Sequence, residues 1–221
     1  MVLLSGGLDS TVLLHYVVRE LGHAPVHALS FRYGQKHVRE LEAARWQAHT
    51  LRPAVCGHHV LDLAFFPALL AESSALVGTV TQVPDLESIP AAERNQPPTY
   101  VPNRNLILLS LAAAFAEAHG CPVLYYGAQA QDEYGYWDCT PEFIGRVNAV
   151  LALNRRHPVR VEAPFSRLDK AGEIRIGLRL GVDFSRTWSC YRGGAHPCGA
   201  CPTCVERANA FRTAGVADPL G

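Results

Sequence analysis

The feature that most constrains the fold is a short Gly-rich segment, residues 5–10, between an apolar run and an amphipathic one. Residues 1–4 have the composition of a short buried strand, and residues 10–21 repeat apolar side chains at helical spacing. Two adjacent glycines let the backbone approach an anion, and the start of the following helix offers N–H donors to it. This order of strand, turn and helix predicts a phosphate-binding loop at the sheet edge where ligands of α/β folds bind.

The loop is not a Walker loop, because that motif requires a lysine and no lysine precedes Lys36. The sequence Ser-Gly-Gly-Leu-Asp-Ser resembles instead the pyrophosphate loop (PP-loop) of the ATP-pyrophosphatase superfamily, whose members transfer AMP to their substrate and release pyrophosphate. The resemblance implies that Asp9 contacts Mg²⁺. The alternative is an ordinary Gly-rich turn in which Asp9 and Ser10 cap the helix. The residues expected to bind ATP are Leu4, Ser5, Gly6, Gly7, Leu8, Asp9, Ser10, Thr11 and Arg104.

The composition favours a soluble protein that acts on small molecules. The 221 residues are 48% hydrophobic, which is enough for one sizeable core. Twenty basic residues balance twenty acidic ones, so nothing in the charge predicts binding to nucleic acid. No apolar stretch is long enough to cross a bilayer, and the N-terminus does not have the pattern of a cleavable leader. We therefore expect a cytoplasmic protein that does not interact with a membrane.

Apolar periodicity predicts alternating strands and helices, and therefore an α/β fold with a doubly wound, mainly parallel five-stranded sheet. The superfamily resemblance implies the adenine nucleotide α-hydrolase-like, Rossmann-like type. We expect residues 1–187 to form the ATP-pyrophosphatase domain and residues 188–221 to pack on it as a metal-binding segment of the same unit. Residues 76–102, with five prolines, should form a long irregular loop. Further strands are expected at 26–31, 59–63, 123–127 and 159–163, and helices at 36–52, 103–119, 141–154, 169–180 and 202–214.

Four of the seven cysteines are crowded into the C-terminal segment in the pattern C-x7-C-x2-C-x2-C. Four thiolates at this spacing suit one tetrahedral Zn²⁺ in a closed structural site. A [4Fe–4S] cluster is the competing occupant, and four unrelated buried cysteines are a third alternative. Cys56 and Cys121 are expected to be small core residues. The expected metal ligands are Cys190, Cys198, Cys201 and Cys204.

Three polar segments are candidates for the rest of the site, namely residues 33–37, 99–105 and 127–139. The first and third follow expected strands, and the second opens an expected helix. Because the carboxyl ends of parallel strands meet at one edge of a sheet, we expect the first and third segments beside the phosphate loop. The alternative for each segment is structural, with its polar residues serving as helix caps, turn formers or solvated loop residues.

Several motifs occur together in this chain: the PP-loop, Tyr-x-Gln-x-His at 33–37, Thr-Tyr-Val-Pro-Asn-Arg-Asn at 99–105, Asp-Glu-Tyr-Gly-Tyr-Trp-Asp-Cys at 132–139, Lys170 and the four cysteines. Their combination resembles the QueC family over nearly the whole chain. The resemblance implies that 7-carboxy-7-deazaguanine, ammonia and ATP are converted to a nitrile, preQ0, in queuosine biosynthesis, with Mg²⁺ and a structural Zn²⁺.

The same resemblance implies roles for particular residues. The implied catalytic residues are Asp9, Ser10, Asp132 and Lys170, and Arg104 and Lys170 are expected to face the phosphates. The implied substrate contacts are Tyr33, Gln35, His37, Asn105, Gln131, Tyr136 and Asp138. The expected partners are ATP, the deazaguanine and ammonia, and a homodimer is compatible with the sequence.

Three rival functions stay open at this point. A relative with this fold can stop at the amide or join the adenylated carboxyl to another amine. A tRNA-modifying enzyme can use the same loop, but it must bind a polyanion, which the neutral charge balance disfavours. A non-catalytic nucleotide-sensing module would require neither Asp9 nor Lys170.

Overall fold

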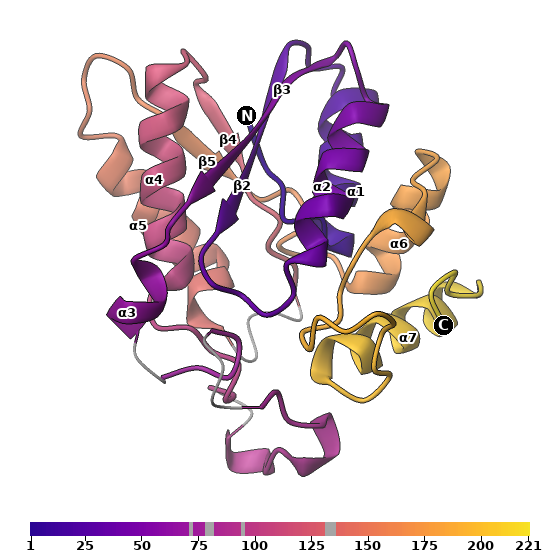
Figure 1. Cartoon of the computed structure of the whole chain (residues 1–221). Coiled ribbons are helices and arrows are strands. Elements are labelled where there is room, and N and C mark those ends of the chain that lie inside the picture. Colours follow the sequence, from indigo (N-terminus) through magenta and orange to yellow (C-terminus); the bar gives the residue numbers. More distant parts are fainter. Residues whose placement is uncertain (71–72, 78–81, 94–95, 131–135) are drawn as a thin grey trace.

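Five parallel strands form the centre of the computed structural model, which describes residues 1–70, 73–77, 82–93, 96–130 and 136–221 (Figure 1). The strand order is β3-β2-β1-β4-β5, so the strand that precedes the phosphate loop lies in the middle of the sheet. In the register, Val2 of β1 is paired with Ala28 on one side and Tyr125 on the other. The predicted fold class is confirmed. The strands are β1 (Val2–Leu3), β2 (Val26–Arg32), β3 (Val55–Asp62), β4 (Val123–Tyr125) and β5 (Arg160–Glu162).

The edge strand β3 differs from the sequence prediction. It begins at Val55, four residues earlier than expected, and pairs with β2 along its length. Its first half contains Cys56, Gly57 and two histidines rather than an apolar run, so the apolar pattern did not reveal it. Cys56 is exposed on this strand, and its predicted core position is therefore wrong. Cys121 is half-buried.

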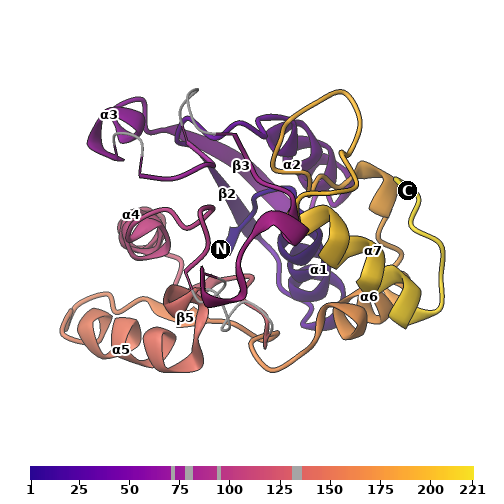
Figure 2. The ribbon, with the colours of Figure 1, turned by 90° about the horizontal axis from the view of Figure 1, so that it is seen from below.

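Helices cover both faces of the sheet (Figure 2). One layer contains α1 (Leu8–His15), α2 (Arg39–Thr50), α6 (Lys170–Arg179) and α7 (Pro202–Ala214). The other contains α3 (Phe66–Leu70), α4 (Arg104–Ala118) and α5 (Pro141–Leu151). Short helical turns complete the described chain: the π-turn η1 (Tyr16–Glu20), which continues α1, and the 3₁₀ turns η2 (Leu86–Ser88), η3 (Ala91–Glu93), η5 (Trp137–Cys139) and η6 (Phe184–Arg186).

Each helical layer has its own apolar core, as alternate side chains of each strand point to opposite faces of the sheet. Val12 of α1 and Ile174 of α6 are fully buried on one face, together with Ala28 of β2. Leu109 of α4 and Leu124 of β4 are buried on the other face. The two cores hold the carboxyl ends of the strands in place, and the phosphate loop follows β1 at that edge.

Local signals account for where several helices begin and end. The Asp169 side chain accepts a hydrogen bond from Gly172 N at 2.6 Å, so Asp169 is the N-cap of α6. Gly181 follows α6 with φ of 67°, a conformation that L-residues adopt at a cost. Among the described non-glycine residues, Asn103 has a positive φ, of 53°. It precedes α4, but its side chain makes no capping hydrogen bond to that helix.

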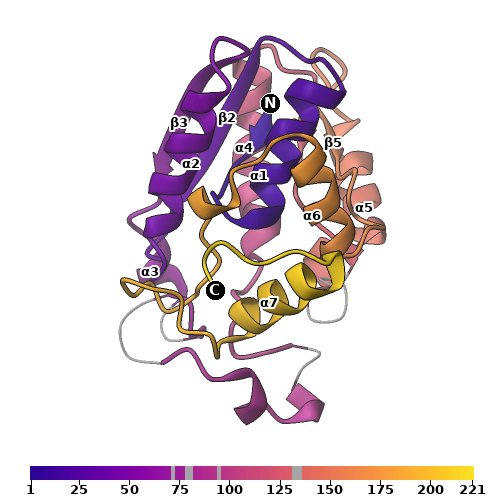
Figure 3. The ribbon, with the colours of Figure 1, turned by 90° about the vertical axis from the view of Figure 1, so that its right-hand side faces the viewer.

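The C-terminal segment packs on α6 through α7, as the side view shows (Figure 3). Phe211 of α7 meets Phe184 edge-on, with ring centroids 5.3 Å apart. Arg207 is buried and forms a two-pronged ion pair with Asp218, with N–O distances of 2.8 and 2.9 Å. The backbone N–H of Trp188 donates to Gly6 O at 3.0 Å, so this segment also contacts the phosphate loop directly. Among the described helices, none has the length and apolarity needed to span a membrane.

Candidate active site

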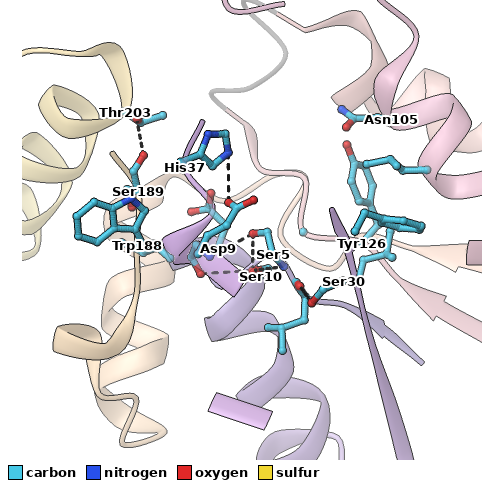
Figure 4. A pocket seen from close by; sticks show the side chains of 18 of the residues that line it. Ser5, Asp9, Ser10, Ser30, His37, Asn105, Tyr126, Trp188, Ser189 and Thr203 are labelled. Atoms are coloured by element: carbon cyan, nitrogen blue, oxygen red, sulfur yellow. Dashed lines mark hydrogen bonds and ion pairs between the residues drawn. The ribbon is translucent and has the colours of Figure 1, made fainter. Parts of the chain in front are cut away.

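The phosphate loop is organised around the hydroxyl of Ser10 (Figure 4). This oxygen accepts hydrogen bonds from the backbone N–H of Ser5 and of Gly6, at 3.1 and 3.2 Å, and lies 2.9 Å from the Ser5 hydroxyl. Ser10 in turn donates to Gly7 O at 3.3 Å. Gly7 is the N-cap of α1 and makes no side-chain capping bond, so Asp9 and Ser10 lie inside the helix and do not cap it.

Position 6 requires glycine because of its backbone conformation and because there is no room for a side chain. Its φ is +92°, and a methyl group there would lie 1.9 Å from the backbone oxygen of Glu40 and 2.7 Å from the backbone nitrogen of Ala44. The loop therefore packs directly against α2. Replacement of this glycine must displace either the loop or the helix.

Asp9 and Lys170 face each other across the loop. The Lys170 ammonium lies 3.6 Å from Asp9 Oδ2 and 3.5 Å from Glu206 Oε2. The second oxygen of Asp9, Oδ1, is buried and has no hydrogen-bond partner among the described residues. A buried carboxylate oxygen without a partner is costly unless a cation or a ligand meets it. Asp9 thus fits the coordination of a hard divalent cation.

A cavity of about 240 Å³ extends from this loop toward the start of α4. Its lining comes from the carboxyl ends of β1, β2 and β4, from α2 and α4, and from the C-terminal segment. Figure 4 shows the side chains of Ser5, Asp9 and His37 on one side, and those of Asn105 and Tyr126 on the other. The size and mixed polar and aromatic lining suit a small organic ligand.

The side of the cavity near α4 is held by a network around Arg104 and Asn105. Arg104 donates to Asn105 Oδ1 at 3.1 Å and to the Tyr33 hydroxyl at 3.4 Å. Asn105 N donates to Asp138 Oδ2 at 3.2 Å, and the Tyr126 hydroxyl donates to Asp138 O at 3.3 Å. Burial raises the pKa of Tyr33 and of Tyr126, so both phenols stay protonated at neutral pH.

The structure brings many of the predicted site residues together around the cavity. Those that line it are Leu4, Ser5, Gly7, Leu8, Asp9, Ser10, Tyr33, His37, Arg104, Asn105, Tyr136 and Lys170. Gly6, Thr11, Gln35 and Asp138 do not line it. Gln131 and Asp132 lie outside the described residues.

The predicted residues that do not line the cavity contribute in other ways. The Gln35 side chain is buried, accepts a hydrogen bond from Tyr33 N at 2.7 Å, and donates to Phe31 O and Glu40 Oε1 at 3.0 Å each. It therefore holds the 33–40 loop together instead of offering its amide to the cavity. Asp138 similarly anchors the start of α4, since it accepts from Asn105 N. Thr11 is fully buried beneath the loop.

Sequence reasoning missed the contribution of the C-terminal segment and one acid of α2. Trp188, Ser189, Tyr191 and Thr203 all line the cavity, as does Glu40. Thr203 donates to Ser189 O at 2.7 Å and the Trp188 indole donates to Cys190 O at 3.0 Å, so the metal-binding segment itself shapes this wall. Trp188 and Tyr191 lie beside Cys190 in the sequence and could have indicated a role in the cavity. The cysteine pattern, however, was interpreted only as a structural metal site.

The four C-terminal cysteines converge, as their spacing predicted. The sulfur atoms of Cys190, Cys198, Cys201 and Cys204 all lie within 4.8 Å of one another. Cys201 N donates to Cys198 Sγ at 3.3 Å, a contact that favours a thiolate at that position. Hydrogen bonds from the Cys190 and Cys204 thiols lower the pKa of Cys201. The cluster is a four-sulfur metal-binding site.

The fold and the loop together define an α/β protein with a parallel five-stranded sheet and a PP-loop-like turn after its central strand. A solved structure with the same fold, the U34-tRNA thiolase NcsA from Methanococcus maripaludis with its [4Fe-4S] cluster, aligns with a TM-score of 0.53 at 14% identity over 96% of this chain and 63% of that one. At this identity the likeness concerns the fold alone.

Sequence comparison identifies the family within that class. The model of the family described as queuosine biosynthesis protein QueC matches residues 1–215, and the chain belongs to this family. A 7-cyano-7-deazaguanine synthase from Marinobacter nauticus is 43% identical, over 99% of this chain and 95% of the relative. Another, from Archaeoglobus fulgidus, is 44% identical over 99% of this chain and 88% of the relative. The chain is thus an enzyme of the QueC family.

Proposed function

We propose that this protein is an ATP-dependent carbon–nitrogen ligase that converts 7-carboxy-7-deazaguanine and ammonia to 7-cyano-7-deazaguanine (preQ0), a step of queuosine biosynthesis, and releases AMP and pyrophosphate. The observation that carries the proposal is a cavity that joins the Gly-rich loop to an aromatic and amide-lined wall. One end suits a triphosphate, and the other suits a flat heterocycle with polar edges. Membership of the QueC family supports this choice of substrate.

The chemistry follows from the weakness of a carboxylate as an electrophile. Attack of the carboxylate oxygen on the α-phosphorus of ATP releases pyrophosphate and leaves AMP bound to the carboxyl. Ammonia then displaces AMP and gives the amide. A second adenylation, on the amide oxygen, followed by loss of AMP and of the remaining N–H protons, gives the nitrile. The same loop serves both rounds.

Each end of the cavity has a task in this proposal. Lys170 and the N-terminus of α1 are proposed to neutralise the departing pyrophosphate, because the N–H groups of residues 5–7 donate to the Ser5 and Ser10 hydroxyls within the loop. Arg104, which the sequence analysis assigned to the phosphates, lines the cavity at the start of α4, and we propose that it supplies a fixed positive charge to the phosphates or to the carboxyl that reacts with them. Asn105 and Tyr136 are proposed to hold the polar edge of the deazaguanine. Asp132, which lies outside the described residues, is proposed either to orient ammonia or to accept a hydrogen bond from the amino group of the deazaguanine.

Two metal ions complete the proposed holoenzyme. Asp9, whose Oδ1 has no partner among the described residues, would hold the Mg²⁺ that accompanies ATP, and that ion would lower the charge on the phosphates. The four cysteines would hold Zn²⁺. A tetrahedral Zn²⁺ with Zn–S bonds of about 2.3 Å places its sulfur atoms about 3.8 Å apart. The 4.0 Å separation between Cys198 Sγ and Cys204 Sγ fits this geometry.

The proposed partners are therefore small molecules. The test is incubation with ATP, Mg²⁺, ammonium and 7-carboxy-7-deazaguanine, followed by mass analysis. Appearance of the amide and then the nitrile, with AMP and pyrophosphate, supports the proposal. Formation of ADP, or no reaction that depends on the deazaguanine, would refute it. Accumulation of the amide alone would show that the second round is missing.

A further inference from the structure

Glu40 is a buried acid on the cavity wall to which the proposed chemistry assigns no role. It lies in the first turn of α2, and its side chain is 10% exposed. Its Oε1 accepts from Gln35 Nε2 at 3.0 Å, and its Oε2 lies 3.4 Å from His37 Nε2. Its backbone oxygen packs against Gly6. The carboxyl is therefore fixed next to the phosphate loop by contacts on both its side chain and its main chain.

Glu40 differs from the other acid that lines the cavity in the described part of the chain. Asp9 lies 3.6 Å from the Lys170 ammonium and is the proposed Mg²⁺ contact, so its charge is already neutralised. The Glu40 carboxyl instead contacts the neutral amide of Gln35 and the His37 ring, and the positive charge of Arg104 in α4 acts to lower its pKa. A carboxyl in such a place can exchange a proton with a ligand in the cavity.

The electrostatic surroundings of Glu40 support proton exchange near neutral pH. Burial raises the pKa of Glu40 to about 8, against the smaller opposing effects of the Gln35 hydrogen bond and of Arg104. The other titratable groups that face it are Tyr33 and His37. Burial raises the pKa of Tyr33, and burial lowers that of His37 to about 3, so both are uncharged at pH 7. A base whose pKa lies near the working pH is well matched to proton transfer.

We propose that Glu40 is the proton acceptor that converts ammonium to ammonia inside the cavity. The inference rests on the proposed function, because it names the group that prepares the nucleophile. At neutral pH nearly all dissolved ammonia is ammonium, which has no lone pair for attack.

The step balances in charge and atoms. With a pKa of about 8, Glu40 is mostly protonated at pH 7, and its ionised minority, which grows as the pH approaches 8, takes one proton from NH4⁺ and becomes a carboxylic acid. The nitrogen lone pair then forms the C–N bond to the adenylated carboxyl. The C–O bond to AMP breaks and its electron pair leaves with AMP. The nitrogen then loses one more proton to solvent, and Glu40 returns its own proton to solvent before the next turnover.

The test separates the two halves of the reaction in Glu40→Gln, which keeps the size of the side chain. Adenylation is measured as deazaguanine-dependent exchange of labelled pyrophosphate into ATP, without ammonium. Amide formation is measured with ammonium and, separately, with hydroxylamine, which is already unprotonated at pH 7. We expect near wild-type exchange, a loss of roughly a hundredfold or more in kcat/KM for ammonium, and near wild-type formation of the hydroxamate. The matched control is Glu42→Gln, an exposed acid of the same helix.

The possible outcomes are distinguishable. If wild-type protein shows no pyrophosphate exchange, the proposed function fails. If exchange is normal and Glu40→Gln uses ammonium as well as wild type does, or loses ammonium and hydroxylamine activity equally, the role of Glu40 is refuted. If Glu40→Gln does not fold, the wild-type pH profile decides. Its kcat/KM for total ammonia should level off above about pH 8, where Glu40 is ionised, whereas a continued rise in proportion to the free ammonia fraction up to pH 9 refutes the inference.

Discussion

Gly6 is the position where the phosphate loop touches α2 most closely, and substitution there gives a sharp test of the site geometry. In Gly6→Ala the backbone would have to keep a φ of +92°, which costs an L-residue about 1–2 kcal/mol. The new methyl group would also lie 1.9 Å from Glu40 O, a backbone atom that cannot rotate away. Relief of such overpacking costs about 1–3 kcal/mol more. The expected loss of stability is therefore about 2–5 kcal/mol.

The chain contains a control that isolates the conformational part of this cost. Gly22 has a φ of +68°, and a methyl group there would meet no atom within 4 Å. The stability of Gly22→Ala should therefore fall only by the cost of the positive φ, about 1–2 kcal/mol. The difference between the two variants measures the contact between the loop and α2.

The assay is thermal unfolding of both variants, with and without Mg²⁺-ATP. For a chain of this size, 1 kcal/mol corresponds to roughly 2–4 °C in Tm. Gly6→Ala should melt well below Gly22→Ala. We also expect Mg²⁺-ATP to raise the Tm of the wild type and not that of Gly6→Ala, because the displaced loop can no longer meet the phosphates. If the two variants melt together and both respond to ATP, the described packing of the loop on α2 is wrong.

Four further outcomes follow from contacts described above. Lys170→Met should reduce pyrophosphate release about a hundredfold or more with little change in Tm, as measured by a coupled pyrophosphate assay. Cys201→Ser should lose the bound metal, as measured by elemental analysis, and should change the tryptophan fluorescence because Trp188 is anchored on Cys190 O. Arg207→Leu leaves Asp218 without its buried partner and should cost about 3–5 kcal/mol in urea unfolding. The pKa of Glu40 is about 8 in the folded chain and 4.5 in its ordinary state, so between these pH values the folded chain keeps a proton that the unfolded chain loses, and the stability of the wild type falls as the pH rises. The Tm of Glu40→Gln relative to that of the wild type should therefore rise from pH 4.5 to 8. A constant difference in Tm would contradict the pKa shift.

Much of the fold could be predicted from the sequence because strong local patterns coincide with the elements that matter. The apolar run before Ser5, the helical spacing after it and the Asp169 cap each depend on residues close together in the chain. The cysteine cluster was predictable for the same reason, as its spacing alone limits the geometry. The structure places the Gly-rich loop directly after the central strand and brings the four sulfur atoms together, as these signals predicted.

The rest depended on contacts between distant segments. Glu40 has the appearance of an ordinary charged residue in an amphipathic helix, and its burial beside Gly6, Gln35 and His37 is seen only in the folded structure. Gln35 was predicted as a substrate contact because it follows a strand, yet its amide is used within its own loop. The cavity wall formed by Trp188 and Tyr191 had no periodic signature at all. Cys56 was misplaced because the sequence does not show which strand lies at the sheet edge.

The hydrogen bond from Trp188 N to Gly6 O joins the Gly-rich loop to the segment that carries the four cysteines. Ser189 alone separates Trp188 from Cys190 in the chain. A change in the cysteine cluster therefore has a short main-chain route to the loop, although the two lie at opposite ends of the sequence.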